Sequence, residues 1–156
     1  MASDELDNYR YIEVPFVAGK ARVRFFNGRA YRPAKDRDRG RAITDAWVRA
    51  YGRNVVYRKG EPVNVSIDVF RPAPKDTPDG GTVAFVVKPD TDNIAKLVLD
   101  ALNGYAYEDD AQVVWLLVSK HWRKRDQEER MRVLVSRAID YDSFHKDEEA
   151  TDASDD

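Results

Sequence analysis

A chain of 156 residues, 42% hydrophobic and 35% charged, has the length and composition of one soluble domain with its own hydrophobic core. It contains no cysteine, which excludes disulfides, thiolate zinc sites and a cysteine nucleophile, and its two histidines argue against a histidine-based metal site. No apolar run approaches the roughly 20 residues of a membrane span, and the acidic, polar N-terminus does not resemble a signal peptide. We therefore expect a cytoplasmic protein of a bacterium or of an infected host cell.

The formal net charge of -2 conceals a division along the chain. Residues 140–156 carry eight Asp/Glu and one Lys, a charge of -7, whereas residues 1–139 carry 25 Lys/Arg and 20 Asp/Glu, a charge of +5. From residue 142 on, the sequence is acidic and poor in core residues, so we expect a folded domain over residues 1–141 and a disordered tail over residues 142–156. The basic body is compatible with a polyanionic partner.

The N-terminal part of the chain predicts a strand and then a hairpin. The strand covers residues 11–17. The hairpin pairs residues 22–26 with residues 29–31 around Asn27-Gly28, because both turn residues tolerate positive φ. A charged connector follows at residues 33–41.

The middle of the chain predicts one helix and one half-buried strand. Apolar residues recur at helical spacing from Ile43 to Ala50, and Gly52 ends this helix. Valine and isoleucine alternate with polar residues over residues 63–69, which is typical of a strand with one buried face. Residues 71–81 are rich in Pro, Asp and Gly and predict a loop.

The last part predicts a helix among three strands. Residues 82–87 form a short apolar strand, and the apolar spacing over residues 94–102 predicts an amphipathic helix that Asn103-Gly104 closes. Residues 113–118 are apolar on both faces, so we expect a central, covered strand there. Alternation over residues 131–135 predicts the final strand.

Four charged side chains flank the second predicted helix. Asp90 and Asp92 share one side of the extended segment before it, Lys96 lies one turn into it, and Asp110 begins the next strand, from which it can return to the same end of the sheet. Clustered carboxylates repel one another, whereas Mg²⁺ needs hard oxygen ligands and neutralises their charge. Such a cluster with a nearby lysine suits phosphodiester hydrolysis.

The same residues also fit a structural role. Asp92 has the side chain of a good N-cap and can pair with Lys96 at i, i+4, and Asp109 and Asp110 suit a turn. Spacing alone leaves the metal site and the structural role open.

The order of these residues resembles the signature of the RusA family of Holliday-junction resolvases, which occur in phages and prophages. The resemblance lies in KPDTDNIAKLVLDALNG at residues 88–104 and EDDAQVV at residues 108–114, and GKARVRFFNGRAYRP at residues 19–33 is similar to the family's N-terminal hairpin. The family's pattern implies that Asp90, Asp92 and Asp110 are the catalytic, metal-binding aspartates and that Lys96 is the catalytic lysine. Asp100 then has a supporting role.

The resemblance also implies an α/β (α+β) fold, with a small mixed sheet on which two main helices pack, and a homodimer. The implied activity is Mg²⁺-dependent cleavage of four-way or branched DNA in recombination and repair, with Mn²⁺ as an alternative ion. Two-fold symmetry suits this substrate, because a junction presents two equivalent strands and a dimer presents two equivalent sites.

Nine basic residues and two acids lie between residues 20 and 41, and a basic hairpin with aromatic residues suits contact with phosphates. A solvated charged face is the alternative. We predict DNA-binding residues on this segment and at the end of the strand after the aspartate pair, namely Lys20, Arg22, Arg24, Arg29, Arg32 and Lys120. The alternative function is a nonenzymatic branched-DNA-binding protein with a structural acidic cluster.

Overall fold

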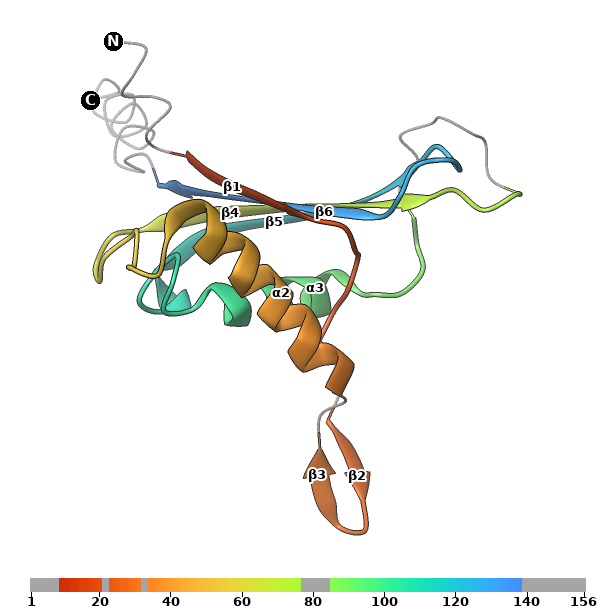
Figure 1. Ribbon diagram of the computed structural model, residues 1–156, viewed down its shortest axis with the longest axis horizontal. Helices are drawn as coiled ribbons and strands as arrows, with labels where there is room; N and C mark the ends of the chain where they lie inside the picture. The colour runs from red at the N-terminus through yellow and green to blue at the C-terminus, as the bar shows by residue number, and fades with distance from the viewer. Residues whose placement is uncertain (1–8, 21–22, 32–33, 77–84, 139–156) are drawn as a thin grey trace, which may run out of the picture.

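The computed structural model describes residues 9–20, 23–31, 34–76 and 85–138. These residues form two layers, in which a four-stranded sheet is covered on one face by two helices (Figure 1). A separate two-stranded hairpin projects away from both layers (Figure 1). The predicted α+β fold with a small mixed sheet and two main helices is therefore confirmed. The predicted acidic tail lies outside the described residues.

The sheet has the strand order β1-β6-β4-β5. Strand β4 (Val63–Pro72) runs parallel to β5 (Val113–Arg123) and antiparallel to β6 (Arg130–Arg137), which pairs antiparallel with β1 (Tyr9–Val14). The strands predicted at residues 11–17, 63–69 and 131–135 are thus present as β1, β4 and β6, although β1 ends three residues before Val17.

Alternation along the strands separates a buried face of the sheet from an open one. Val65, Ile67 and Val69 of β4 are fully buried, and Val133 and Val135 of β6 are buried with them. Since successive side chains of a strand point to opposite faces, the polar residues between them lie on the face that the helices leave open.

Both helices place apolar side chains against the buried face. Helix α2 (Ala34–Tyr51) buries Ile43 and Trp47, and helix α3 (Thr91–Leu102) buries six of its 12 residues. Helix α3 connects the parallel strands β4 and β5, a connection that cannot be made by a tight turn.

The segment predicted as a charged connector at residues 33–41 is helical throughout its described part, because α2 begins at Ala34. Lysine, arginine and alanine favour helices, so the segment has helical propensity. The buried side chains of α2 are Ile43 and Trp47, which lie in its second half. The first two turns of the helix therefore lack the apolar spacing from which a helix is predicted.

The strand expected at residues 82–87 is also wrong in its described part, because residues 85–87 are not a strand. Phe85 is buried and its ring centroid lies 4.9 Å from that of Trp122, whereas Val86 and Val87 are exposed. Residues 85–87 therefore contribute one packed aromatic side chain, Phe85, and no strand pairing. Residues 82–84 lie outside the described part.

Strand β5 contradicts the expectation of a central, covered strand at residues 113–118. The strand is present, but it lies at the edge of the sheet, with β4 as its neighbour. Val114, Trp115, Leu116 and Leu117 are between 42% and 62% exposed. Strand β5 therefore has the apolar composition of a central strand, but within one chain its outer edge is uncovered.

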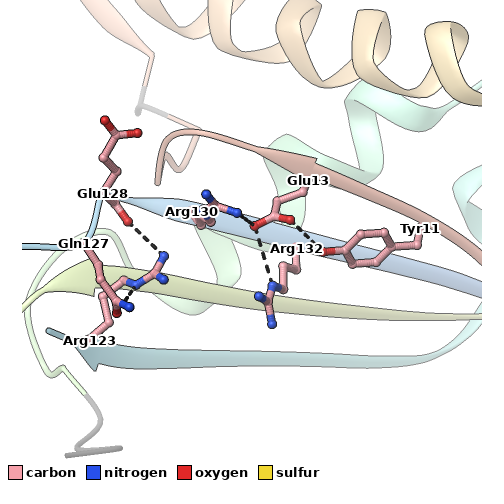
Figure 2. Close-up of polar contacts among 7 residues, drawn as sticks. All are labelled: Tyr11, Glu13, Arg123, Gln127, Glu128, Arg130 and Arg132. Atoms are coloured by element: carbon pink, nitrogen blue, oxygen red, sulfur yellow. Dashed lines mark hydrogen bonds and ion pairs between the residues drawn. The ribbon is translucent and has the colours of Figure 1, made fainter. Parts of the chain in front are cut away.

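On the open face, Glu13 of β1 joins a polar cluster with β6 (Figure 2). Arg130 Nη1 donates to Glu13 Oε1 over 2.7 Å, and the Tyr11 hydroxyl donates to Oε2 over 2.9 Å. The hydrogen bond from Arg130 lowers the pKa of Glu13 below its ordinary value of 4.5, and the Tyr11 bond acts in the same direction against partial burial. The charged form of Glu13 is therefore favoured in the folded chain.

This cluster predicts a loss of stability in acid. A carboxylate whose pKa is lower in the folded than in the unfolded chain stabilises the fold above the unfolded value, and this contribution disappears as the pH falls through the folded value. We expect the free energy of unfolding to fall more steeply between about pH 5 and pH 3 for the natural chain than for Glu13→Gln, which does not titrate. Urea unfolding at several pH values measures both slopes. Glu128→Gln is the control, because the bond drawn to Glu128 in Figure 2 runs from Arg123 to its backbone carbonyl and does not involve Glu13. Equal slopes for Glu13→Gln and the natural chain would contradict the prediction.

Candidate active site

Asp90 and Asp92 lie at the N-terminus of α3, and helix capping accounts for neither carboxylate. Asp90 occupies the N-cap position with φ -73° and ψ 152°, but its side chain makes no capping hydrogen bond. It pairs instead with the ammonium group of Lys88. Asp92 lies inside the first turn and is exposed, so the alternative in which it is the N-cap is wrong.

Lys96 lies one turn further along α3 and is also exposed. No ion pair joins it to Asp92, although the spacing permits one. The N-terminus of a helix carries a partial positive charge that favours anions. An exposed pair of carboxylates beside a lysine at this end of α3 can hold a hard cation and face a phosphate.

The segment before Asp90 is held by two basic side chains from the ends of neighbouring strands. Lys120 Nζ of β5 donates to the carbonyl oxygens of Val87 and Pro89 over 2.7 and 2.9 Å. Arg71 Nη1 of β4 donates to the carbonyl oxygen of Lys88 over 2.8 Å. Three successive carbonyls are thus fixed to the sheet, and the backbone position of Asp90 is fixed with them. We call this arrangement the carbonyl clamp.

The clamp rests on the ring of Phe85. Lys120 Nζ lies 4.7 Å from the ring centroid and the Arg71 guanidinium carbon 5.7 Å from it, so both cations also interact with the aromatic face. Sequence reasoning assigned Lys120 to DNA and missed Arg71. Both residues lie near the carboxyl ends of the parallel strands β4 and β5, and this pairing could not be predicted from the sequence alone.

The clamp predicts a separable effect of Lys120→Met. This change keeps the length of the side chain and removes both hydrogen bonds. We therefore expect the DNA cleavage that the sequence resemblance implies to slow by about 10- to 100-fold, the range for groups that orient ligand residues. Affinity for DNA should change little, and Lys120→Arg should restore part of the rate. Single-turnover cleavage and a binding titration at several salt concentrations measure the two effects. A weakened affinity with a smaller salt slope and an unchanged cleavage rate would mean that Lys120 contacts phosphate instead.

Asp110 lies beyond the other end of α3, in the 3₁₀ turn η1 (Asp110–Gln112). Asp109 caps this turn by accepting from Ala111 N over 2.9 Å, and Gln112 completes a capping box. Asp109 therefore has the turn role that its sequence position suggested. Burial and, to a smaller extent, the nearby charge of Asp110 raise the pKa of Tyr107.

The distance along α3 separates Asp110 from the other two aspartates. A helix of 12 residues is about 18 Å long. The Tyr107 hydroxyl donates to the carbonyl of Leu99 over 2.9 Å, which places the turn containing Asp110 at the C-terminal end of α3. The expectation that Asp110 returns to the end occupied by Asp90 and Asp92 is therefore wrong within one chain. Accordingly, the residues that the structure describes contain no group of three carboxylate or histidine ligands that could hold one ion.

The remaining predicted residues divide between structural contacts and an exposed hairpin. Lys20 pairs with Asp100 of α3, and its backbone N–H donates to the carbonyl of Asn93 over 2.9 Å. Arg24 and Arg29 lie on exposed strands of the hairpin. Arg22 and Arg32 lie outside the described residues. The side chain of Lys20 is thus paired with Asp100 of α3.

Two comparisons with known proteins found similar sequences. A family model described as "Endodeoxyribonuclease RusA" matches residues 14–136. A protein of Bacillus subtilis (strain 168), named "Uncharacterized protein YqaN", is 39% identical over 83 residues, which cover 47% of this chain and 56% of that protein. The chain thus spans little more than half the length of this relative. No helix in the described part of the chain is long and apolar enough to cross a membrane.

Proposed function

Because the chain belongs to the RusA family of endodeoxyribonucleases, we propose that it resolves Holliday junctions and other branched DNA as a metal-dependent homodimer. The observation that carries this proposal is the pair Asp90 and Asp92, partly exposed at the N-terminus of α3, not used for capping and held by the carbonyl clamp. A folding role does not explain why side chains from two strands donate hydrogen bonds to the backbone of this segment. We also propose that the protein acts in DNA recombination and repair, in a bacterium or a phage-infected cell.

The donor set suits Mg²⁺, or Mn²⁺ in its place, because both ions prefer carboxylate oxygens. When bound, the ion supplies Lewis acidity at the scissile phosphate and lowers the pKa of the attacking water. Asp90 and Asp92 hold the ion, the clamp fixes Asp90, and the ammonium of Lys96 offsets the charge that grows on the phosphate. One chain supplies two of the three predicted aspartates at this end of α3.

The exposed edge of β5 points to where the third aspartate comes from. Residues 113–118 carry no charge. Trp115 and Leu117 lie on the open face of the sheet, because they pair with Asn64 and Ser66 of β4. Leu116 lies on the helix side, because it pairs with the buried Val65. A partner that completes this edge must be an uncharged, apolar strand with unpaired backbone groups. The β5 strand of a second copy meets this requirement, and pairing would make both strands central, as their composition predicts.

Antiparallel pairing of two β5 strands brings opposite ends together. Asp110 lies just before β5, whereas Lys120, near its other end, contacts the segment that carries Asp90. A two-fold axis close to Trp115 and Leu116 therefore places the partner subunit's Asp110 beside Asp90 and Asp92. The dimer then contains two sites, each built from both subunits.

A junction-cleavage assay tests the proposed activity. Purified protein should nick a four-way DNA junction at symmetrical positions in Mg²⁺ or Mn²⁺ and should not nick it in EDTA. A linear duplex of the same arms is the control substrate. Binding of the junction without nicking in any divalent metal would refute the enzyme and leave the nonenzymatic DNA-binding alternative.

The dimer edge is tested by Trp115→Lys/Leu117→Lys. Both side chains are about half exposed, so the single chain should still fold, but two lysines facing their copies across the axis should prevent pairing. We expect a molar mass of 17.9 kDa for the variant and twice this value for the natural chain in light scattering. Phe25→Lys/Phe26→Lys, on the more exposed hairpin, is the matched control and should remain dimeric. A dimeric Trp115→Lys/Leu117→Lys variant would place the interface elsewhere.

A further inference from the structure

The hairpin formed by β2 (Arg24–Phe26) and β3 (Arg29–Tyr31) exposes aromatic side chains that the fold does not use. Phe25 is 75% exposed and Phe26 is 70% exposed, and Tyr31 is also exposed. Asn27 and Gly28 form the turn with φ values of 49° and 74°, as the sequence predicts. The hairpin extends away from the sheet and from both helices (Figure 1). Two adjacent phenylalanines at the end of such an arm expose apolar surface to water, which is unfavourable unless a partner covers them.

The register gives the hairpin two different faces. Arg24 pairs with Tyr31 and Phe26 pairs with Arg29, so one face carries two arginines and two aromatic rings. Phe25 pairs with Ala30, so the other face is apolar. Within the described residues, neither Arg24 nor Arg29 has an ion-pair partner. Rings interleaved with unneutralised arginines match the bases and phosphates of an unpaired nucleic acid strand.

The last residues described before the hairpin, Gly19 and Lys20, are fixed at the proposed active site. Gly19 packs so closely on α3 that an added Cβ would lie 3.0 Å from the Cβ atoms of both Asn93 and Pro89. Lys20 follows, with its backbone N–H bonded to Asn93 and its ammonium paired with Asp100. Pro89 and Asn93 are the immediate neighbours of Asp90 and Asp92. The chain that leads into the hairpin therefore lies beside these carboxylates up to Lys20.

We propose that Phe25 and Phe26 stack on bases that are unpaired at the branch point of the DNA whose backbone lies at Asp90 and Asp92, while Arg24 and Arg29 contact the flanking phosphates. The proposal rests on the proposed function, since it takes the same DNA as its ligand. Stacking on rings tolerates any base sequence and requires bases released from pairing, so it favours branched over linear DNA. The hairpin thus provides selectivity for the branch, and the carboxylates provide the chemistry.

Fluorescence of 2-aminopurine tests the stacking without any cleavage. A four-way junction carries the probe next to the branch point, or, as a control, in the middle of one arm, and protein is added in EDTA. We expect the natural chain to change the fluorescence of the branch-point probe alone. Phe25→Ala/Phe26→Ala should abolish this change and weaken selectivity for the junction over a linear duplex by at least about tenfold. Phe25→Tyr/Phe26→Tyr should preserve both, and Tyr9→Ala, an exposed aromatic residue of β1, should behave like the natural chain.

The possible outcomes separate this inference from the proposed function. An unchanged fluorescence response in Phe25→Ala/Phe26→Ala would overturn the stacking role even if the protein cleaves junctions. A change in molar mass in this variant would also overturn it, because the hairpin would then contact protein. A natural chain that alters branch-point fluorescence but never nicks would retain the stacking role and lose the nuclease.

Discussion

Asp92→Asn is expected to slow junction cleavage by at least about a thousandfold, because charge stabilisation by a bound metal is worth several kcal/mol of the barrier and about 1.4 kcal/mol corresponds to a factor of ten. The asparagine keeps the size of the side chain and removes the anionic oxygen. Affinity for the junction should stay the same or increase, because a negative charge facing phosphate disappears. Single-turnover cleavage in Mg²⁺ and a binding titration in EDTA measure the two quantities.

The matched control is Asp109→Asn. Asp109 lies in the same acidic motif, but it accepts a hydrogen bond from Ala111 N and caps η1, so this variant should lose some stability and keep its cleavage rate. Thermal unfolding separates the two variants further. Asp92 makes no capping bond, so Asp92→Asn should not lower the melting temperature. An unfolded Asp92→Asn, or one that cleaves normally, would refute the metal-binding role.

A second expected result concerns mixtures of inactive variants. Asp92→Asn and Asp110→Asn should each be inactive alone, but subunits mixed in equal amounts should recover about a quarter of the natural nicking rate. Half of the dimers would contain one subunit of each kind, and one of the two sites in each of these would be intact. The recovered activity should give single nicks and not paired cuts, because the second site in the same dimer lacks both groups.

The control for this experiment is a mixture of Asp90→Asn with Asp92→Asn. These residues come from the same end of α3 in one chain, so every site in a mixed dimer would still lack one of them. No activity should return. If no pair of variants complements, including Asp92→Asn with Asp110→Asn, the three aspartates do not come together across the dimer, and the arrangement of β5 strands proposed above is wrong.

The sequence predicted the elements whose conformation is determined by neighbouring residues. The Asn27-Gly28 turn, the apolar stripe of α3 and the alternation of β4 determine their own conformation, and the structure has all three. The first two turns of α2 were missed because they bury little and therefore leave no pattern. The apolar residues before Lys88 predicted a strand, whereas their main contribution is one buried ring, Phe85.

The candidate site was predictable in its residue types and not in its geometry. Resemblance to a family predicts that Asp90, Asp92 and Asp110 act together, but the length of α3 keeps Asp110 apart from the other two in one chain. The carbonyl clamp was not predictable, because Lys120 and Arg71 meet residues 87–89 only through the parallel pairing of β4 and β5. Both failures concern contacts between segments that are distant in the sequence.

The uncovered edge of β5 also bears on how much of the protein a cell must contain before any DNA is cut. In the proposed dimer neither subunit holds a complete site, so specific activity falls with dilution once the concentration drops below the dissociation constant of the dimer. A few molecules dispersed in a cell would remain inactive on intact chromosomes. A branched DNA that collects two copies raises their local concentration, so the substrate itself would set the threshold for the enzyme that cuts it.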